Sequence, residues 1–410
     1  MRIAHRYPVL MLSLLALAGC GQSADKPAAA AAAAPGTTVI KLGHASPMTG
    51  PIAHIGKDTE YGAQIAVDEL NSEGVQLDGK PVTFQLVSED DQGDPKMATQ
   101  IAQRMVDAKI AGMIGHLNSG TTIPASKIYA DANIGQITPS ATNPAFTQQG
   151  FKTTFRLIAD DVQQGKALAD FAVNTLKAKK IAIIDDRSAY GQGLADEFDK
   201  AAKALGVEIV KREFTSTSAT DFMAILTGIK GAQPDLIFFG GVDAQAAPMV
   251  KQMHKLGVKA PLLSGDGTQT GNFIKLAADA AEGQYASAAG APKEQLPGYA
   301  SFAEKLKKKY NAEVVIYSPY SYDAVKVMAA AMQKAGSADP AKYLPALAAT
   351  QYQGATGLIR FDAQGNRQHS AVTIYQVRQG RWEVIGVVGG ENSAQADAPA
   401  AGKDSGKKPD

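Results

Sequence analysis

The sequence predicts an α/β protein of two lobes, each a doubly wound parallel sheet covered by helices. Its 410 residues exceed the roughly 300 beyond which a single hydrophobic core stops growing. Short apolar runs rich in β-branched residues alternate with helical segments, an order typical of parallel sheets with helices on both faces. The alternation runs twice, over about 39–158 and about 179–287, without a strong sequence repeat between the halves.

The predicted strands are short and bounded by turn residues. They span 39–45, 82–87, 110–117, 134–138, 180–185, 207–214, 236–240 and 261–264. After residue 350 the pattern changes to three runs that look like short strands, over 357–362, 372–378 and 381–388. Gln379-Gly380 is expected to form the hairpin turn between the last two.

Helical segments lie between most of these strands. Asp94 followed by Pro95 is typical of a helix start, and Met97, Ile101 and Met105 then recur at four-residue steps. Similar spacing predicts helices over 194–205, 222–229 and 299–310. Since open α/β sheets bind ligands beyond the carboxyl ends of their strands, we expect the site residues there.

The N-terminus is similar to a bacterial lipoprotein signal. Arg2 and Arg6 precede an apolar run over 8–19 that is too short to span a bilayer. The run ends Leu-Ala-Gly-Cys at 17–20, which resembles the lipobox, whose cysteine is lipid-modified and becomes the first mature residue. We expect removal of 1–19 and an anchor at Cys20; the alternative is an incidental cysteine after an ordinary signal peptide.

Composition narrows the class of ligand. Loss of Arg2 and Arg6 would lower the basic residues from 41 to 39, against 40 acidic ones. This balance provides no electrostatic footprint for nucleic acid or anionic lipid, so a neutral or zwitterionic small ligand is expected. Cys20 is the only cysteine, which excludes a disulfide within the fold. We expect 20–37, rich in alanine, to be a tether and 391–410 to be a disordered tail.

Two strand ends in the first half carry small hydroxyl residues. The run 115–122, Gly-His-Leu-Asn-Ser-Gly-Thr-Thr, ends a strand and opens a helix, where Ser119 and free N–H groups suit a carboxylate. Ser119 or Thr121 could equally cap that helix. After the next strand, Thr142 could complete the carboxylate site or cap a turn, and the Ser140 carbonyl could accept from an ammonium.

Two strand ends in the second half offer a phenol and a carboxylate. Tyr190 follows the strand over 180–185 and could cover a ligand or hold its own loop in place. Asp266 lies between Gly265 and Gly267 after the strand over 261–264, so it could approach a ligand closely or be a turn aspartate.

With these residues in view, the chain resembles the substrate-binding proteins of branched-chain amino-acid ABC transporters, the Leu/Ile/Val-binding family with the type I periplasmic-binding fold. The matching stretches fall in order at 48–51, 94–96, 115–117, 124–126, 137–142, 190–191 and 239–241. The resemblance covers about 38–388 and implies two lobes joined by three hinge crossovers. Lobe one would comprise 38–158 and 291–365, and lobe two 159–290 and 366–390.

The resemblance also implies roles for individual residues. Ser119 and Thr142 would hold the ligand α-carboxylate, and the carbonyl acceptor for the α-ammonium would be Ser140, with Ala141 beside it. Asp266, at a position where the family often has Glu, would pair with the ammonium, and Tyr190 matches the family tyrosine before the lobe-two helix.

Several positions depart from the family pattern. Gly93 and Asn118 stand where some members have a disulfide, and we include Asn118, which precedes Ser119, in the predicted ligand-binding set. Ile55 stands where the family often has Tyr, and Val242 with Asp243 replaces an aromatic residue. Since these are side-chain pocket positions, the resemblance supports α-amino-acid recognition better than it supports leucine, isoleucine or valine.

The predicted mechanism is a hinged trap. Lobe one would bind the zwitterion first, and Asp266 with Tyr190 would then close over it and exclude water, which strengthens charge-assisted hydrogen bonds. Hinges are expected near 156–160, 287–292 and 362–370. The closed form would pass its ligand to an ABC permease in the cytoplasmic membrane. We expect a monomer in the periplasm or at the cell surface, touching the membrane through its lipid only.

Other functions remain as alternatives. A hydrolase is disfavoured because the sequence has no Gly-x-Ser-x-Gly elbow, no His-Glu-x-x-His and no phosphate-binding Gly-x-x-x-x-Gly-Lys-Ser/Thr loop, so no enzyme activity, cofactor or metal is predicted. A sensor that uses the same trap, or a binding protein for an amide, a urea or an aromatic acid, stays open. Asp266 argues for a ligand with a cationic group.

Overall fold

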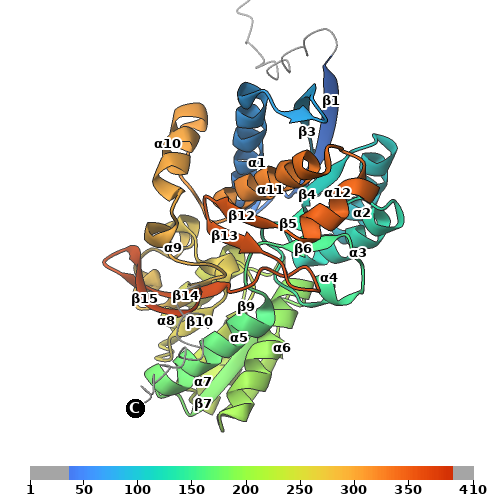
Figure 1. Ribbon diagram of the computed structural model, residues 1–410. Coiled ribbons are helices and arrows are strands. Elements are labelled where there is room, and N and C mark those ends of the chain that lie inside the picture. Colours follow the sequence, from blue (N-terminus) through green and yellow to red (C-terminus); the bar gives the residue numbers. More distant parts are fainter. Residues whose placement is uncertain (1–36, 391–410) are drawn as a thin grey trace, which may run out of the picture.

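The computed structural model describes residues 37–390 (Figure 1). The predicted signal peptide over 1–19, the anchor at Cys20, nearly all of the tether and the tail over 391–410 lie outside the described residues. Within 37–390, no helix has the length and apolar character that crossing a membrane requires. The same part of the chain contains no cluster of three or more His, Cys, Asp or Glu residues that could hold a metal ion.

The first sheet has six strands in the order β2-β3-β1-β4-β5-β6, and all neighbours except β2 and β3 pair in parallel. The strands are β1 (Thr38–Ser46), β2 (Gln76–Leu77), β3 (Lys80–Asp90), β4 (Gly112–Gly115), β5 (Gln136–Thr138) and β6 (Thr154–Arg156).

The second sheet has seven strands in the order β15-β14-β11-β10-β9-β7-β8. The strands are β7 (Lys180–Asp185), β8 (Glu208–Phe214), β9 (Leu236–Gly240), β10 (Leu262–Ser264), β11 (Tyr285–Ala288), β14 (Ala371–Arg378) and β15 (Arg381–Gly389). Both pairings of β14 are antiparallel, and the other pairings are parallel. A separate hairpin joins β12 (Gln351–Gly354) to β13 (Gly357–Arg360).

The sheets are mostly parallel, as predicted, and carry antiparallel strands at two edges: β2 pairs with β3, and β14 pairs with both of its neighbours. β2 and β3 are separated by two residues, as are β14 and β15, and so short a connection can join only antiparallel strands. Parallel neighbours need a long crossover, usually a helix, and the remaining connections have that length. The predicted turn at Gln379-Gly380 is confirmed.

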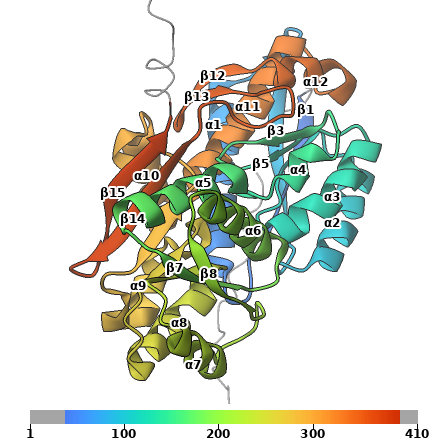
Figure 2. The same cartoon turned by 90° about the horizontal axis from the view of Figure 1, so that it is seen from below.

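Helices cover both faces of each sheet, and in both views α12 lies toward the upper right of the molecule while α7 lies near the bottom (Figures 1 and 2). Around the first sheet are α1 (Ala53–Glu73), α2 (Pro95–Asp107), α3 (Ser119–Asp131), α4 (Ala145–Gln148), α10 (Tyr299–Tyr310), α11 (Ser318–Ala335) and α12 (Pro340–Ala348). Around the second are α5 (Asp161–Asp170), α6 (Ala189–Ala204), α7 (Met223–Ala232), α8 (Asp243–Leu256) and α9 (Gly271–Ala277). We call each sheet with its helices lobe one and lobe two.

Strand β7 is apolar from Ile181 to Ile184 because helices cover both of its faces. Ile181 and Ile183 pack in one hydrophobic cluster with Phe198 of α6, while Ala182 and Ile184 pack in another with helices α7 and α8. Because successive side chains of a strand point to opposite faces, a strand covered on both sides is apolar at every position.

The helix starts follow capping chemistry. Asp94 Oδ1 accepts hydrogen bonds from the backbone N–H groups of Lys96 and Met97, both at 2.8 Å, so the predicted start of α2 is confirmed. Helix α6 begins at Ala189, five residues before the predicted segment, because Ser188 caps it by accepting from Gly191 N at 2.9 Å.

Three crossovers connect the lobes and lie against one another. The first follows β6, the second follows β11 and the third follows β13. Ala159 N donates to Ala289 O at 3.0 Å, which joins the first crossover to the second. Arg156 N donates to Gly365 O at 2.9 Å and Arg367 N donates to Arg156 O at 3.0 Å, which joins the first to the third. The division of the chain at 158, 290 and 365 stays a prediction.

A single carboxylate fixes the start of α11 against α1. Asp58 on α1 is buried and accepts hydrogen bonds from four consecutive backbone N–H groups at 2.7 to 3.0 Å, those of Val315, Ile316, Tyr317 and Ser318. These N–H groups precede or open α11, so they have no partner within the helix, and a charged acceptor satisfies all of them.

Replacing Asp58 by Asn is expected to lower the free energy of unfolding by about 2–4 kcal/mol, because the amide loses the charge and one acceptor. Urea denaturation would measure the loss. Asp68→Asn on the same helix is the control. Its exposed carboxylate contacts Gln64 and Lys309, so its removal should change stability by less than about 1 kcal/mol. Equal losses in the two variants would contradict the role of Asp58.

Candidate functional site

The structure places the predicted site residues at the carboxyl ends of strands in both sheets. Ser119 opens α3 after β4, and Ser140, Ala141 and Thr142 follow β5. Tyr190 lies in the first turn of α6 after β7, and Asp266 begins the 3₁₀ turn η2 (Asp266–Thr268) after β10. All of these residues are buried. The lobe-one set and the lobe-two set therefore line the inner edges of their sheets.

In lobe one, two hydroxyls are held by their neighbours and one is not. Ser119 Oγ accepts from Asn143 N at 3.2 Å, and Ser140 Oγ donates to Leu117 O at 2.9 Å. Thr142 Oγ1 and Asn118 Oδ1 are buried and have no hydrogen-bond partner among the described residues. Buried polar atoms without partners are rare in folded proteins, so both are available to a ligand.

The helix-cap alternative for Ser119 and Thr121 is not what the structure shows. The N-cap position of α3 is Asn118, which makes no side-chain capping bond, and Ser119 is the first helical residue. Thr121 Oγ1 donates to Asn118 O at 2.9 Å instead of accepting from the helix. The first N–H groups of α3 thus receive no side-chain cap from Asn118.

The buried residue His116 connects the segments that follow β4 and β5. His116 Nδ1 lies 2.7 Å from Asp91 Oδ2, and its Nε2 lies 3.2 Å from Tyr129 Oη. The His116 carbonyl accepts from Thr122 Oγ1 at 3.1 Å and from Thr138 Oγ1 at 3.0 Å. Because Thr122 belongs to α3 and Thr138 to β5, this residue ties the segment carrying Ser119 to the one carrying Thr142.

In lobe two, Asp266 is the centre of a buried network. Its Oδ1 accepts from Tyr190 Oη at 2.9 Å and from Gln164 Nε2 at 3.3 Å, while its Oδ2 accepts from Tyr317 Oη at 2.6 Å. Tyr190 Oη also accepts from Gly267 N at 2.9 Å. Burial raises the pKa of Asp266, although the hydrogen bonds from Tyr317, Tyr190 and Gln164 oppose the rise.

A second buried carboxylate, Asp161, lies beside this network. Both of its oxygens lack a hydrogen-bond partner among the described residues. Burial raises the pKa of Asp161 well above its ordinary value, and the charge of Asp266 raises it further, whereas the nearby Thr142 hydroxyl and Arg156 oppose the rise. Because these two buried carboxylates repel each other, a cation bound beside them would stabilise their ionised forms.

Sequence reasoning missed three residues of this group, namely Asp161, Gln164 and Tyr317. Asp161 follows β6 closely, so the rule that directs attention to strand ends could have found it, but 156–160 was interpreted only as a hinge. Gln164 lies one turn into α5, and Tyr317 lies in the connection from α10 to α11, immediately before α11. No local pattern marks either of them.

The two lobes touch across the site. Tyr317 of lobe one donates to Asp266 of lobe two, as described above. His54 Nε2 on α1 lies 2.7 Å from Asp243 Oδ2 at the start of α8, and Asn143 Nδ2 donates to Ala189 O at 2.6 Å. Each of these contacts joins a residue of lobe one to a residue of lobe two. The structure is therefore a closed arrangement of the lobes.

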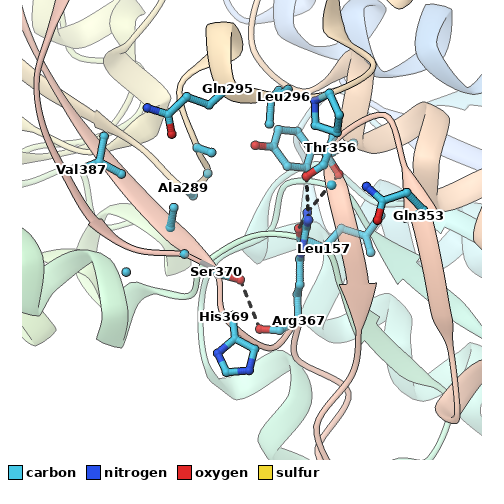
Figure 3. Close-up of a pocket in the computed structure, with 18 residues that line it drawn as sticks. Leu157, Ala289, Gln295, Leu296, Gln353, Thr356, Arg367, His369, Ser370 and Val387 are labelled. Carbon is cyan, nitrogen blue, oxygen red and sulfur yellow. Dashed lines mark hydrogen bonds between the residues drawn. The ribbon is translucent and has the colours of Figure 1, made fainter. Parts of the chain in front are cut away.

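Two cavities lie near the crossovers rather than on the predicted residues. One, of about 660 Å³, is lined by Leu157, Ala289 and Arg367 of the three crossovers. Figure 3 shows Arg367 pointing to Thr356, whose Oγ1 accepts from its Nη1 at 3.0 Å. The other, of about 720 Å³, contains Tyr317 and therefore adjoins the Asp266 network. Neither is lined by Ser119, Thr142, Tyr190 or Asp266.

Two α/β lobes that meet over a buried polar site and are joined by three crossovers define a two-lobed binding protein. Comparison with known families agrees: the chain belongs to the periplasmic binding protein family, whose model matches residues 39–381. The family prediction and the α/β periplasmic-binding fold are thereby confirmed. The family consists of binding proteins, which supports the prediction that the chain is not an enzyme. Its members give no test of the lipid anchor.

Individual relatives span nearly the whole described region. An amino acid binding protein of Pseudomonas aeruginosa is 36% identical over 342 residues, which cover 82% of this chain and 90% of that protein. A leucine-, isoleucine-, valine-, threonine- and alanine-binding protein of the same organism is 33% identical over 341 residues, covering 82% and 89%. The crystal structure of a leucine-binding protein of Thermotoga maritima superposes with a TM-score of 0.80 at 29% identity, covering 86% and 99%.

The raised pKa of Asp161 leads to a second prediction. Because the folded state holds this proton more tightly than the unfolded chain, stability of the ligand-free protein should fall as the pH rises through the raised pKa. Asp161→Asn removes that charge, so it should flatten the decline and stabilise the ligand-free protein at neutral pH by about 1–3 kcal/mol. Thermal unfolding across pH measures both effects.

The control is Asp131→Asn, which changes an exposed carboxylate of α3 that pairs with Lys127. It should leave the pH dependence unchanged. Asp266, whose pKa is also raised, would still contribute a residual slope in Asp161→Asn. A slope as steep as that of the parent protein would assign the titration to other groups.

Proposed function

We propose that this chain is the extracytoplasmic solute-binding component of an ABC importer and that it binds an α-amino acid, branched-chain or otherwise aliphatic, between its lobes. The observation that carries the proposal is the pair of buried carboxylates, Asp161 and Asp266, in a site that also offers the unpartnered Thr142 Oγ1 and the first turn of α3. A zwitterion supplies a charge of the right sign to each pole. The names of the relatives from Pseudomonas aeruginosa and Thermotoga maritima agree with this ligand class.

The anionic end of the ligand fits lobe one. Helix α3 has 13 residues, and its first turn offers backbone N–H groups with the partial positive charge of a helix N-terminus. Ser119 Oγ and the unpartnered Thr142 Oγ1 can donate to the same carboxylate. Asn118 adds a polar side chain at the helix start.

The cationic end fits the acidic side of the cleft. An ammonium group near Asp266 and Asp161 would favour the ionised form of both and relieve their mutual repulsion. The carbonyl of Ser140, next to Ala141, is the proposed further acceptor. An aromatic acid without a cationic group would leave the two carboxylates uncompensated, so the structure favours an amino acid over that alternative.

The resemblance and the closed arrangement support the remaining parts of the proposal. We infer that the mature chain begins at a lipid-modified Cys20, that the lobes divide near 158, 290 and 365, and that Tyr190 and Asp266 close over a ligand first held by lobe one. The closed form, as a monomer, would present both lobe surfaces to the permease.

The anchor is tested by expressing the full chain in the presence of a radioactive fatty acid. The protein should become labelled, and the label should be absent from Cys20→Ser.

Thermal unfolding of a chain lacking residues 1–20, screened against the common amino acids, tests ligand class. A ligand at 100 times its dissociation constant stabilises by about 2.7 kcal/mol. Asp266→Ala should abolish the stabilisation by amino acids, while Asp279→Ala, which replaces an exposed acid of the same lobe, should retain it.

The affinity for amino acids should also fall as the pH drops through the raised pKa of Asp266, since the protonated acid cannot pair with an ammonium. Full stabilisation in Asp266→Ala would refute the cation assignment.

The carboxylate pole is tested by the double variant Ser119→Ala with Thr142→Ala. Loss of two hydrogen bonds to a charged group should weaken amino-acid binding by about 3–6 kcal/mol, as measured by titration calorimetry. Thr121→Ala is the matched control, because among the described residues this neighbouring hydroxyl donates to Asn118 O and is engaged within its own turn. Unchanged affinity in the double variant would mean that the carboxylate lies elsewhere.

A further inference from the structure

Within residues 37–390, Arg156 is the largest side chain that is fully buried, and it ends β6 where the first crossover begins. Its guanidinium makes four hydrogen bonds, and all four acceptors are uncharged oxygens in other segments. Burying a cation among neutral acceptors is unfavourable unless its donors are well satisfied. The position therefore calls for an explanation beyond packing.

Two of these bonds reach the proposed carboxylate subsite. Arg156 Nη1 donates to Ala141 O at 2.5 Å, and its Nη2 donates to Asn143 O at 3.1 Å. These carbonyls stand on either side of Thr142, whose hydroxyl is unpartnered. Arg156 thus holds the backbone on both sides of the residue proposed to bind the ligand.

The other bonds reach toward the third crossover. Arg156 Nε donates to Asn366 Oδ1 at 3.1 Å, and the same oxygen accepts from Thr147 Oγ1 at 2.9 Å. Arg156 Nη2 also donates to Thr147 Oγ1 at 3.2 Å. Gly365 allows the approach, because a Cβ there would lie 2.0 Å from Thr154 O and its φ is +92°. The third crossover is therefore fixed to β6 through residue 366.

The charge of Arg156 also bears on the site. Burial lowers its pKa to about 10, so it stays protonated at neutral pH, and Asp160, Asp161 and Asp362 oppose the lowering. Its charge in turn opposes the rise in the pKa of Asp161. A neutral side chain at position 156 could make some of the same hydrogen bonds, but it could not lower the pKa of Asp161 through its charge.

We propose that Arg156 is a positioning residue that couples the ligand-carboxylate subsite at 141–143 to the hinge, because one guanidinium holds that loop and the third crossover together. The inference rests on the proposed function for the identity of the subsite. It implies that the third crossover bends beyond Gln368, in 369–370, rather than over all of 362–370, because Arg367 N and Gln368 N are also bonded to Arg156 O and Arg360 O. Ligand affinity and lobe closure should consequently depend on the same side chain.

Three variants weaken the link to different degrees, and one serves as a control. Arg156→Met removes all four bonds, Arg156→Lys keeps the charge but not the fork, and Asn366→Ala removes only the crossover acceptor. Arg367→Met is the matched control. Its guanidinium also donates near the hinge, to Leu157 O, Leu358 O and both oxygens of Thr356.

Hydrogen exchange in the ligand-free protein tests the positioning role directly. Backbone amides over 142–148 and 365–367 should exchange at least about 10-fold faster in Arg156→Lys and Asn366→Ala than in the parent, as expected when a bond to a charged group is lost. Arg367→Met should leave 142–148 unchanged. Should Arg156→Met fail to fold, the other two variants still decide the question. Unchanged exchange over 142–148 in both would overturn the inference.

Binding measurements test the coupling. Arg156→Lys should weaken leucine binding about 10-fold or more, against less than about 3-fold for Arg367→Met at similar loss of melting temperature. In a Thr142→Ala background the effect of Arg156→Lys should shrink to less than about 3-fold, because the two residues act through one subsite. Additive effects would reduce Arg156 to a structural role and overturn the coupling. If the parent protein bound no amino acid, the proposed function would fail, while the exchange data would still decide the positioning role.

Discussion

The carboxyl ends of two parallel sheets face each other in this protein, and the geometry of the site depends on that constraint. Parallel strands end at a common edge, so the segments after β4 and β5 gather in one lobe and those after β7 and β10 in the other. Backbone bonds between crossovers, such as Ala159 to Ala289, keep the two edges opposed. A single connection would leave the relative orientation of the lobes free.

Some buried polar groups are fully hydrogen-bonded within the fold, whereas others lack a hydrogen-bond partner. Asp58 and His116 are fully engaged, the first by four N–H groups and the second by Asp91 and Tyr129. Thr142 and Asp161, by contrast, lack partners among the described residues. Each buried group without a partner lowers the stability of the unliganded fold by about 1–3 kcal/mol. The surrounding hydrogen-bonded groups must therefore hold these residues in place.

Arginine chemistry explains how one residue can serve both the loop and the hinge. A guanidinium carries five N–H donors in a rigid plane, so Arg156 can bond to the loop at 141–143 with one edge and to Asn366 with its Nε. A lysine ammonium has a single donor centre and cannot span the same acceptors. The interlobe contacts of Tyr317 and His54 are single hydrogen bonds to carboxylates, and each can break when the lobes separate.

Much of the fold was determined by the sequence alone. The bounds of β7, β9 and α10 coincide with the predicted runs, because burial on two faces makes a strand continuously apolar and burial of one face gives a helix its spacing. Asp94 predicted the start of α2, since capping is a local hydrogen bond. Strands β2, β6, β11 and β12 were missed because they are short and consist mostly of polar or small residues, so they form no apolar run.

The strand-end rule also identified Ser119, Thr142, Tyr190 and Asp266, whose positions depend on local strand-to-helix transitions. Tertiary structure alone decided which groups meet them. Tyr317 and Gln164 reach Asp266 from 51 and 102 positions away, and Arg156 reaches Asn366 from 210. Such contacts depend on how the crossovers pack and on which charged groups become buried together. Periodicity and capping are local patterns, so they do not predict the distance between segments that are remote in the chain.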